Sequence, residues 1–358
     1  MVYSREKMAG ENILEDDKKI NICFVAPVPP PYGGIANWTS MVCRYLERTC
    51  PEVVHYTVIN TAPRQRVTEG RTIWNRVVGG GLDMLCHRRK LRKLLHGKHI
   101  DAVHITTSGS LSVIRDWMLS RVAKRYGAAI IYHIHFGRIP ELKKNNSFQW
   151  KVIRKIVGMA NYVIAIDKST YHALWDNYGQ KIRYIPNPID LRDMPVRNEH
   201  PQKVVMYLGW VIKEKGIEEL LQAWENIYPD NKEWKLEIVG PYKKEYLDYL
   251  QNRYITDGVE FLGEKSHAQA MDLLNASSIF VLPSYTEGCP YVIMEAMALG
   301  KIIIGTNVGN IPEMLGDGCG YVVAKKNVDM LQIALKNVMA DNVNVNTGDY
   351  AREKVKES

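Results

Sequence analysis

Two carboxylates eight positions apart frame the stretch that decides the fold of this chain, Glu287-Gly288-Cys289-Pro290-Tyr291-Val292-Ile293-Met294-Glu295. The apolar run before it, residues 279–282, is closed by a Pro-Ser pair, which is typical of a buried strand. Residues 290–299 begin with proline and are followed by glycine, which is the pattern of a helix. The sequence therefore places Glu287 on a strand-to-helix loop and Glu295 near the second turn of that helix.

This loop is a candidate ligand site. In an open α/β sheet, ligands bind at the loops that follow the carboxyl ends of the strands. A helix start offers unpaired N–H groups and a partial positive charge, and both suit a phosphate. The two carboxylates can accept hydrogen bonds from hydroxyl groups. We therefore expect a phosphorylated ligand that also carries hydroxyls.

Strand and helix patterns alternate through both halves of the chain, which predicts two parallel sheets with helices on both faces and a cleft between them. In the first half, strands are predicted at 20–27, 55–60, 102–106, 129–135, 162–166 and 182–185, and helices at 35–48, 87–98 and 111–126. In the second half, strands are predicted at 203–208, 235–239, 259–262, 279–282 and 301–305, and helices at 216–228, 244–254, 266–275 and 290–299. The expected division is a polar tail at 1–19, a first domain at 20–190, a linker at 191–202, a second domain at 203–345 and a tail at 346–358.

Composition agrees with a two-domain globular protein. The chain has 358 residues, too many for one typical core, with 46% hydrophobic and 24% charged residues. Its six cysteines show no metal-binding spacing, so free thiols in a reducing compartment are expected. We find no apolar stretch of the roughly 20 residues needed to span a membrane, and the polar start is not a signal peptide. A cytoplasmic protein is the expectation.

Charge is distributed unevenly along the chain. Residues 1–190 hold 29 Lys and Arg against 15 Asp and Glu, whereas the rest of the chain holds 18 against 24. Basic side chains on helices such as 87–98 are often simply solvated, but a whole basic half favours an anionic partner. Each Lys or Arg near an anionic leaflet contributes ~1 kcal/mol. No nucleic-acid-binding motif is present, so an anionic membrane surface, such as the inner face of the plasma membrane, is the expected partner rather than nucleic acid.

Five segments in order resemble one known family, the family 4 glycosyltransferases. The Glu-Gly-x-Pro-x-x-x-x-Glu stretch followed by Ala-Met-Ala-x-Gly resembles the family's donor-site motif. The other four segments are Pro29-Pro30-Pro31-Tyr32-Gly33-Gly34, His133-Ile134-His135-Phe136-Gly137, Ile185-Pro186-Asn187-Pro188-Ile189-Asp190, and Tyr207-Leu208-Gly209 with Glu214-Lys215-Gly216. The resemblance covers most of the chain and implies the GT-B fold, in which two Rossmann-like domains face each other across a cleft. The C-terminal helix that crosses back in this family is expected to be short or missing.

The resemblance also implies a metal-independent donor site. No Asp-x-Asp metal motif occurs in the chain, so fixed cations and helix N-termini are expected to hold the diphosphate. Lys215 corresponds to the family lysine beside the phosphates, and Gly209 to the strand glycine before it. The family usually follows that glycine with an arginine, whereas this chain has Trp210, which leaves either reduced activity or compensation by a cation such as Lys213.

The donor-site motif supplies the remaining donor contacts. Glu295 matches the glutamate that accepts hydrogen bonds from the ribose hydroxyls, although a structural ion pair is the alternative for a helical glutamate. Glu287 matches the carboxylate near the transferred sugar. The N–H groups of Gly288 and Cys289 are expected to hold sugar hydroxyls, while Pro290 has no N–H to give. The Cys289 side chain itself is expected to be packing rather than a nucleophile.

Two further segments complete the expected site. His135, at the carboxyl end of its strand, resembles the family histidine close to the reacting sugar, and His133 faces the same side of that strand. Gly33 and Gly34 follow the first strand and allow the backbone to approach a phosphate, although a tight turn is the simpler explanation for two glycines.

The leading hypothesis is a retaining, metal-independent glycosyltransferase that needs no cofactor. It is expected to move a hexose from a UDP- or GDP-sugar to a carbohydrate, free or lipid-linked, in surface polysaccharide synthesis. Two alternatives stay open: a UDP-sugar epimerase on the same fold, and a non-catalytic member that acts as an assembly partner. A nicotinamide dehydrogenase is disfavoured because Pro-Pro-Pro-Tyr-Gly-Gly-Ile is not G-x-G-x-x-G.

Overall fold

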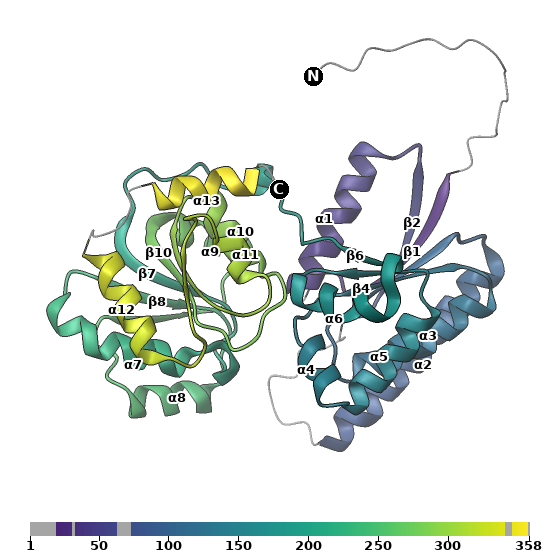
Figure 1. Ribbon diagram of the computed structural model, residues 1–358, viewed down its shortest axis with the longest axis horizontal. Coiled ribbons are helices and arrows are strands. Elements are labelled where there is room, and N and C mark those ends of the chain that lie inside the picture. The colour runs from purple at the N-terminus through teal and green to yellow at the C-terminus, as the bar shows by residue number, and fades with distance from the viewer. Residues whose placement is uncertain (1–18, 31–32, 63–72, 341–345, 357–358) are drawn as a thin grey trace, which may run out of the picture.

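The computed structural model describes residues 19–30, 33–62, 73–340 and 346–356, which form two lobes side by side (Figure 1). Pro31 and Tyr32 of the predicted glycine loop, and residues 1–18 of the predicted polar tail, lie outside the described residues. Each lobe contains one six-stranded sheet in which all neighbouring strands are parallel. The structure therefore confirms an α/β protein with two parallel-sheet lobes.

The first lobe is a six-stranded parallel sheet with helices on both faces. Its sheet runs in the order β2 (Val54–Asn60), β1 (Ile20–Ala26), β3 (Ala102–Thr107), β4 (Ala129–Ile134), β5 (Tyr162–Ala165) and β6 (Ile182–Tyr184). Its helices are α1 (Gly34–Thr49), α2 (Ile73–Gly97), α3 (Ser112–Arg125), α4 (Ile139–Lys144), α5 (Phe148–Met159) and α6 (Lys168–Tyr178). Helices α2, α3 and α5 pack against one another as one layer, and α1 lies on the other face of the sheet (Figure 1).

The second lobe has the strand order of a dinucleotide-binding sheet. Its sheet runs in the order β12 (Tyr321–Val323), β11 (Ile302–Thr306), β10 (Ser277–Leu282), β7 (Gln202–Leu208), β8 (Lys235–Val239) and β9 (Val259–Gly263). Its helices are α7 (Ile217–Ile227), α8 (Lys244–Arg253), α9 (His267–Ala276), α10 (Tyr291–Ala298), α11 (Ile311–Leu315), α12 (Val328–Met339) and α13 (Thr347–Lys356). The winding direction reverses between β7 and β10, and such a switch point is where ligands bind in these sheets.

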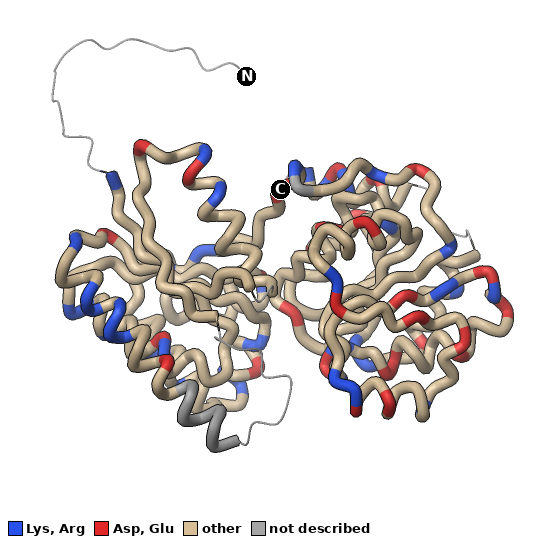
Figure 2. The backbone as a smooth tube through the Cα atoms, turned by 180° about the vertical axis from the view of Figure 1, so that it is seen from behind, with Lys and Arg blue, Asp and Glu red and all other residues tan. Residues whose placement is uncertain are grey.

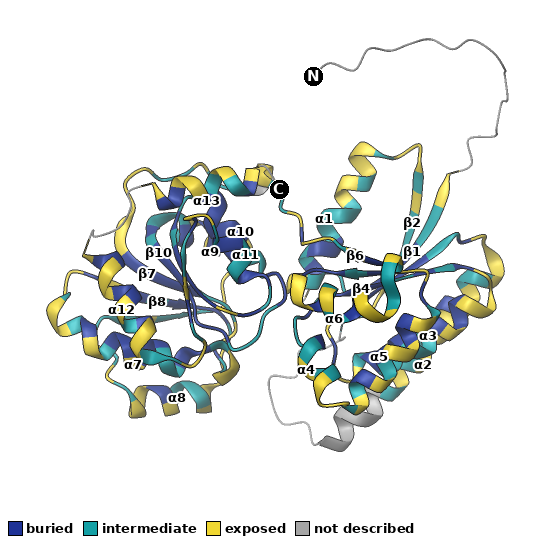
Figure 3. Cartoon of the chain, in the orientation of Figure 1, coloured by how far each residue is buried: buried dark blue, intermediate teal, exposed yellow. Residues whose placement is uncertain are grey.

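Each lobe has its own hydrophobic core (Figure 3). Central strands such as β3 and β10 are buried on both faces, as expected for parallel sheets covered by helices. Ile166 of the first lobe packs with the second core, so the lobes touch as well as face each other. Within the segment predicted as a C-terminal tail, α13 buries Ala351 and Val355 against the second lobe and contacts α10.

The predicted strands are all present, with ends within two residues of the expected ones, and the predicted helices are present too. One helix is longer than expected: the segment predicted at 87–98 belongs to α2, which begins at Ile73. The short strand β12 and helices α4, α5, α6, α11, α12 and α13 have no counterpart among the predicted elements. Pro290 is the N-cap of α10 rather than its first residue, so that helix begins at Tyr291.

Candidate active site

The switch point of the second sheet brings Lys215 and Glu287 together. Lys215 ends a 3₁₀ turn after β7, and Glu287 lies on the loop after β10, the neighbouring strand. The Lys215 Nζ atom lies 2.6 Å from Glu287 Oε1, and the two side chains are 25% and 13% exposed. Two residues 72 positions apart thus form a partly buried ion pair at the edge where a ligand is expected.

Tight contact between the two loops explains this pairing. Gly216 has φ +72°, and a Cβ there would lie 2.1 Å from the carbonyl oxygen of Pro283. Only glycine accepts both this left-handed conformation and the close approach. The Tyr285 N–H also donates to the Glu214 carbonyl at 2.9 Å. The turn after β7 is therefore held against the loop after β10, which places Lys215 beside Glu287.

Glu295 has a different partner. It lies in the middle of α10, is only 8% exposed, and its Oε1 atom is 2.7 Å from Nε2 of His267, the first residue of α9. The alternative of a structural pairing is therefore observed for Glu295 in this unliganded structure. Glu295 and His267 both line a cavity.

That cavity, of about 490 Å³, lies between the two lobes. Its lining comes from the loop after β1, from α1, from the connection between the lobes, and from α9 and α10: Pro29, Asn37, Ser40, Met41, Arg44, Ile189, Asp190, Met194, His267, Tyr291 and Glu295. The Lys215–Glu287 pair is not part of its lining. Glu287 lies on the loop that follows β10 and Glu295 on the helix that follows that loop, so one segment connects the ion pair to the cavity.

The glycine loop meets the same helix from the first lobe. Gly33 is the N-cap of α1, with extended backbone, and Gly34 is the first helical residue. A Cβ on Gly34 would lie 3.9 Å from the Tyr291 ring at the start of α10. The N-terminus of α1 therefore points its free N–H groups toward the junction with α10.

His135 belongs to a buried cluster of rings under this junction. Its ring lies 3.9 Å from that of His133 and 5.3 Å from that of Trp38 on α1, between ring centres. His133 Nδ1 in turn lies 3.1 Å from Nε2 of His104 on β3. Burial lowers the pKa of His135 to about 3 and that of His104 to about 4, and it lowers the pKa of His133 as well. All three imidazoles are therefore neutral at physiological pH.

Glycines allow the lobes to touch at this point. A Cβ on Gly137 would lie 2.2 Å from the Glu287 carbonyl oxygen, and one on Gly288 would lie 2.7 Å from Ile166. Asn187 Nδ2 donates to the Cys289 carbonyl at 2.8 Å, and the Tyr184 hydroxyl donates to Asn310 at 3.0 Å. The segment that contains His135 and the loop that contains Glu287 therefore share one interlobe contact.

The remaining predicted site residues lie at the same sheet edge. Cys289 is buried, and burial raises the pKa of its thiol to about 11, which fits a packing residue rather than a nucleophile. Gly209, directly after β7, donates its N–H to Val239 at 2.9 Å, and a Cβ on Gly240 would lie 1.8 Å from the Gly209 carbonyl. Trp210 is 49% exposed and offers no charge. Lys213 pairs with Glu218 at 3.7 Å, away from Glu287.

Two features of the site were not predicted from the sequence. One is His267, whose signal was available: a histidine at the first turn of a helix that follows a strand of the second sheet. The other is Lys326, whose ammonium lies 4.6 Å above the Tyr285 ring, next to the loop of Glu287. Lys326 follows β12, a strand that the sequence pattern did not reveal.

The described part of the chain shows neither a metal-binding cluster nor a membrane-spanning helix. Over residues 19–30, 33–62, 73–340 and 346–356, we find no group of three or more His, Cys, Asp or Glu side chains placed to hold a metal ion. Among the helices described, none combines the length and the apolar character needed to cross a membrane.

Two protein-family models match the chain, one on each side of residues 192–193. A model described as Glycosyltransferase Family 4 matches residues 32–193, and one described as Glycosyl transferases group 1 matches residues 192–356. Among curated proteins, a putative teichuronic acid biosynthesis glycosyltransferase, TuaC of Bacillus subtilis, is 28% identical over 52% of this chain and 49% of its own length. An N-acetyl-alpha-D-glucosaminyl L-malate synthase of Bacillus anthracis is 31% identical over 44% of this chain and 41% of its own. The chain spans about half the length of the curated relatives it matches.

Solved structures match over nearly the whole chain. The lipopolysaccharide outer core galactosyltransferase WaaB has a TM-score of 0.67 at 18% identity, with 94% of this chain and 95% of that one covered. HepE of Anabaena, in complex with UDP and glucose, has a TM-score of 0.68 at 15% identity over the same shares. At this level of identity the likeness concerns the fold, which is the GT-B arrangement of two facing sheets.

Proposed function

Because the chain belongs to glycosyltransferase family 4, whose two models together span residues 32–356, we propose that it transfers a hexose from a nucleoside diphosphate sugar to a carbohydrate acceptor. The observation that carries the proposal is the Lys215–Glu287 pair, 2.6 Å apart at the switch point of the second sheet. The bond that breaks joins the anomeric carbon of the sugar to a phosphate oxygen. The cation suits the diphosphate that leaves, and the carboxylate suits the electron-poor sugar carbon that remains.

In this proposal Lys215 balances the charge of the leaving diphosphate. When the bond between the anomeric carbon and the phosphate oxygen breaks, negative charge grows on the diphosphate, and a preorganised cation stabilises it. The free N–H groups at the start of α1 and α10 add to this stabilisation. The Glu287 carboxylate, which binds Lys215 in the unliganded structure, is assigned to the sugar side of the bond, where it stabilises the positive charge that develops on the anomeric carbon.

Nucleoside binding is assigned to the cavity beside Glu295. Its volume of about 490 Å³ accommodates a small ligand, and Glu295 offers an acceptor for ribose hydroxyls. Binding there requires His267 to share or release that carboxylate, since the two are 2.7 Å apart. The complex of HepE with UDP and glucose supports a nucleotide and a sugar as the ligand classes.

The finer features of the reaction are part of the proposal. Retention of anomeric configuration and independence of metal are proposed from the resemblance to the family. Surface polysaccharide synthesis is supported by the names of relatives such as TuaC and the capsular polysaccharide glycosyltransferase CapM of Staphylococcus aureus. An anionic membrane surface is proposed as a further partner, because Lys and Arg gather on the helices of the first lobe (Figure 2).

A non-catalytic role is the second candidate, and it is motivated by Trp210. An uncharged, half-exposed ring stands directly after the Gly209 turn, where a second cation would otherwise face the diphosphate. A non-catalytic member would bind nucleotides weakly or not at all.

The test is a thermal-shift screen of UDP- and GDP-sugars, followed by product analysis with and without oligosaccharide acceptors. Transfer to an acceptor with release of UDP or GDP supports the proposal. An altered nucleotide sugar without acceptor identifies an epimerase instead. If calorimetry detects no binding of either UDP or GDP, the non-catalytic role is the correct one.

A further inference from the structure

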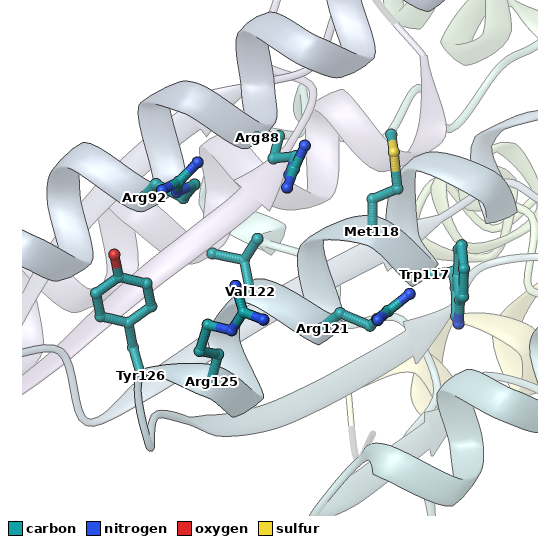
Figure 4. A pocket seen from close by; sticks show the side chains of 8 residues that line it. All are labelled: Arg88, Arg92, Trp117, Met118, Arg121, Val122, Arg125 and Tyr126. Carbon is teal, nitrogen blue, oxygen red and sulfur yellow. The ribbon is translucent and has the colours of Figure 1, made fainter.

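A groove between α2 and α3 gathers four arginines far from the site described above. Arg88 and Arg92 extend from α2, and Arg121 and Arg125 from α3, around a cavity of about 300 Å³ (Figure 4). Trp117 and Tyr126 lie at opposite ends of the groove, and Met118 and Val122 complete its lining.

The groove lies away from the catalytic cleft. Helix α3 runs antiparallel to the strands it covers, so its last turn, with Arg121 and Arg125, lies near the start of β4 at Ala129. Lys215, Glu287 and His135 follow the carboxyl ends of their strands, at the opposite edge of their sheets. A ligand in the groove therefore does not take part in the reaction.

Nothing in the described residues neutralises these four charges. None of the four arginines forms an ion pair with a carboxylate there, and helices α2, α3 and α5 contain Asp83 and Asp116 as their acidic residues. Asp116 is fully buried and already binds Arg115 at 2.7 Å. Each arginine pair is also spaced i, i+4 on its helix, where like charges repel. The empty groove is therefore electrostatically unfavourable, and an anion would relieve the repulsion.

The chemistry of the lining selects the anion. A guanidinium is a planar fork of N–H donors that fits phosphate oxygens in pairs, and it does so better than an ammonium. Arg121 lies with its guanidinium 5.0 Å from the centre of the Trp117 ring, which orients it along the groove. Buried Val122 offers an apolar surface beside the charges.

We propose that this groove is a binding site for an anion that carries a phosphate group, distinct from the donor site. The same chemistry is offered by the headgroup of an anionic phospholipid and by a free phosphate compound. The neighbouring surface includes the exposed side chains of Leu82 and Leu85 on α2. The two sources are separated by the experiment below.

Binding is measured in two arms, both in a Lys215→Ala background, which weakens binding of phosphate at the donor site. The first arm titrates pyrophosphate by calorimetry. The second floats the protein with vesicles of phosphatidylcholine, with or without phosphatidylglycerol. The test variant is Arg92→Gln/Arg125→Gln, with one arginine removed from each wall of the groove. Its matched control is Lys90→Gln/Lys151→Gln, which removes the same charge from exposed positions on α2 and α5 outside the groove.

The groove variant should lose binding by about tenfold or more, since it loses hydrogen bonds between charged groups, while the control should change it by less than about threefold. If the groove variant, but not the control, loses binding of pyrophosphate, the ligand is a free phosphate compound. If the same difference is seen with anionic vesicles alone, the ligand is a lipid headgroup. The groove variant should also be as thermally stable as the control or more so, because repulsion is relieved. Equal loss in both double variants means that only net charge attracts anions, and that result overturns the proposal. Absence of binding in both arms overturns it as well.

Discussion

Lys215 Nζ lies 2.6 Å from Glu287 Oε1, and this contact joins the turn after β7 to the loop after β10. Each residue follows one of the two strands between which the winding of the sheet reverses. A bound diphosphate would compete with Glu287 for the lysine, so the pair holds the cation in place before the ligand arrives. Such preorganisation lowers the cost of gathering charge when the donor binds.

Lys215→Ala should reduce turnover of the nucleotide sugar by about 10²–10³, the range for one preorganised charge donor. Steady-state release of UDP or GDP measures it. Lys213→Ala is the control, because Lys213 lies on the same turn as Lys215 but pairs with Glu218 rather than with Glu287. Turnover unchanged in the Lys215 variant removes this residue from the site.

Glu295→Gln should weaken binding of UDP or GDP by about tenfold, because hydrogen bonds to a charged acceptor are lost. Binding of the matching 2′,3′-dideoxynucleotide should hardly change, since it lacks the hydroxyls that Glu295 is proposed to hold. Calorimetry with both nucleotides makes the comparison. If the substitution weakens binding of the two nucleotides by the same factor, Glu295 acts through its pairing with His267 rather than on the ribose.

Gly137→Ala should destabilise the protein by about 1–3 kcal/mol, the usual cost of overpacking, and lower its turnover. The new Cβ would lie 2.2 Å from the Glu287 carbonyl oxygen, so either the lobes separate or the loop moves. Gly158→Ala on α5 is the control: apart from the backbone of its own helix, no atom lies within 4 Å of the Cβ that the change would add, and the change should stabilise the helix by up to about 1 kcal/mol. Urea unfolding compares the two, and a neutral Gly137→Ala would contradict the close contact.

Stability should fall as the pH drops below about 6.5, the ordinary pKa of histidine. Burial lowers the pKa of His104 to about 4 and that of His135 to about 3, so the unfolded chain takes up these protons before the folded one. Each such histidine contributes a slope of up to about 1.4 kcal/mol per pH unit between its unfolded and folded pKa. Urea unfolding at pH 7.5, 6 and 5 measures the slope, which should be smaller in His104→Leu.

The exposed His172 on α6 provides the control for this experiment, since His172→Gln should leave the slope unchanged. Equal slopes in the wild type and in His104→Leu would mean that the imidazole cluster is hydrated in solution.

Removal of divalent metal with EDTA should lower turnover by less than about twofold, because Lys215 and the helix N-termini are proposed to hold the diphosphate. A steep loss, restored by Mg²⁺ or Mn²⁺, would show that the diphosphate needs a cation that the chain does not supply.

Local patterns were enough to predict most of the architecture. Runs such as 279–282, rich in apolar and β-branched residues, identify parallel strands because such strands are buried on both faces. The three-residue strand β12 is too short to give a periodic signal, so the sequence does not predict it. Helices α4 and α11 are also too short to be predicted. The local patterns do not predict helices α5, α6, α12 and α13.

The sequence by itself determined that two α/β lobes form and that Lys215 and Glu287 each follow a strand of the second sheet, since strand periodicity and loop position are local properties of the chain. Only the tertiary structure decided that these two residues pair, that His267 binds Glu295, that three histidines share one buried cluster, and that four arginines meet in a groove. Such contacts join residues far apart along the chain, and their distances are set by how strands align and helices pack rather than by spacing in the sequence.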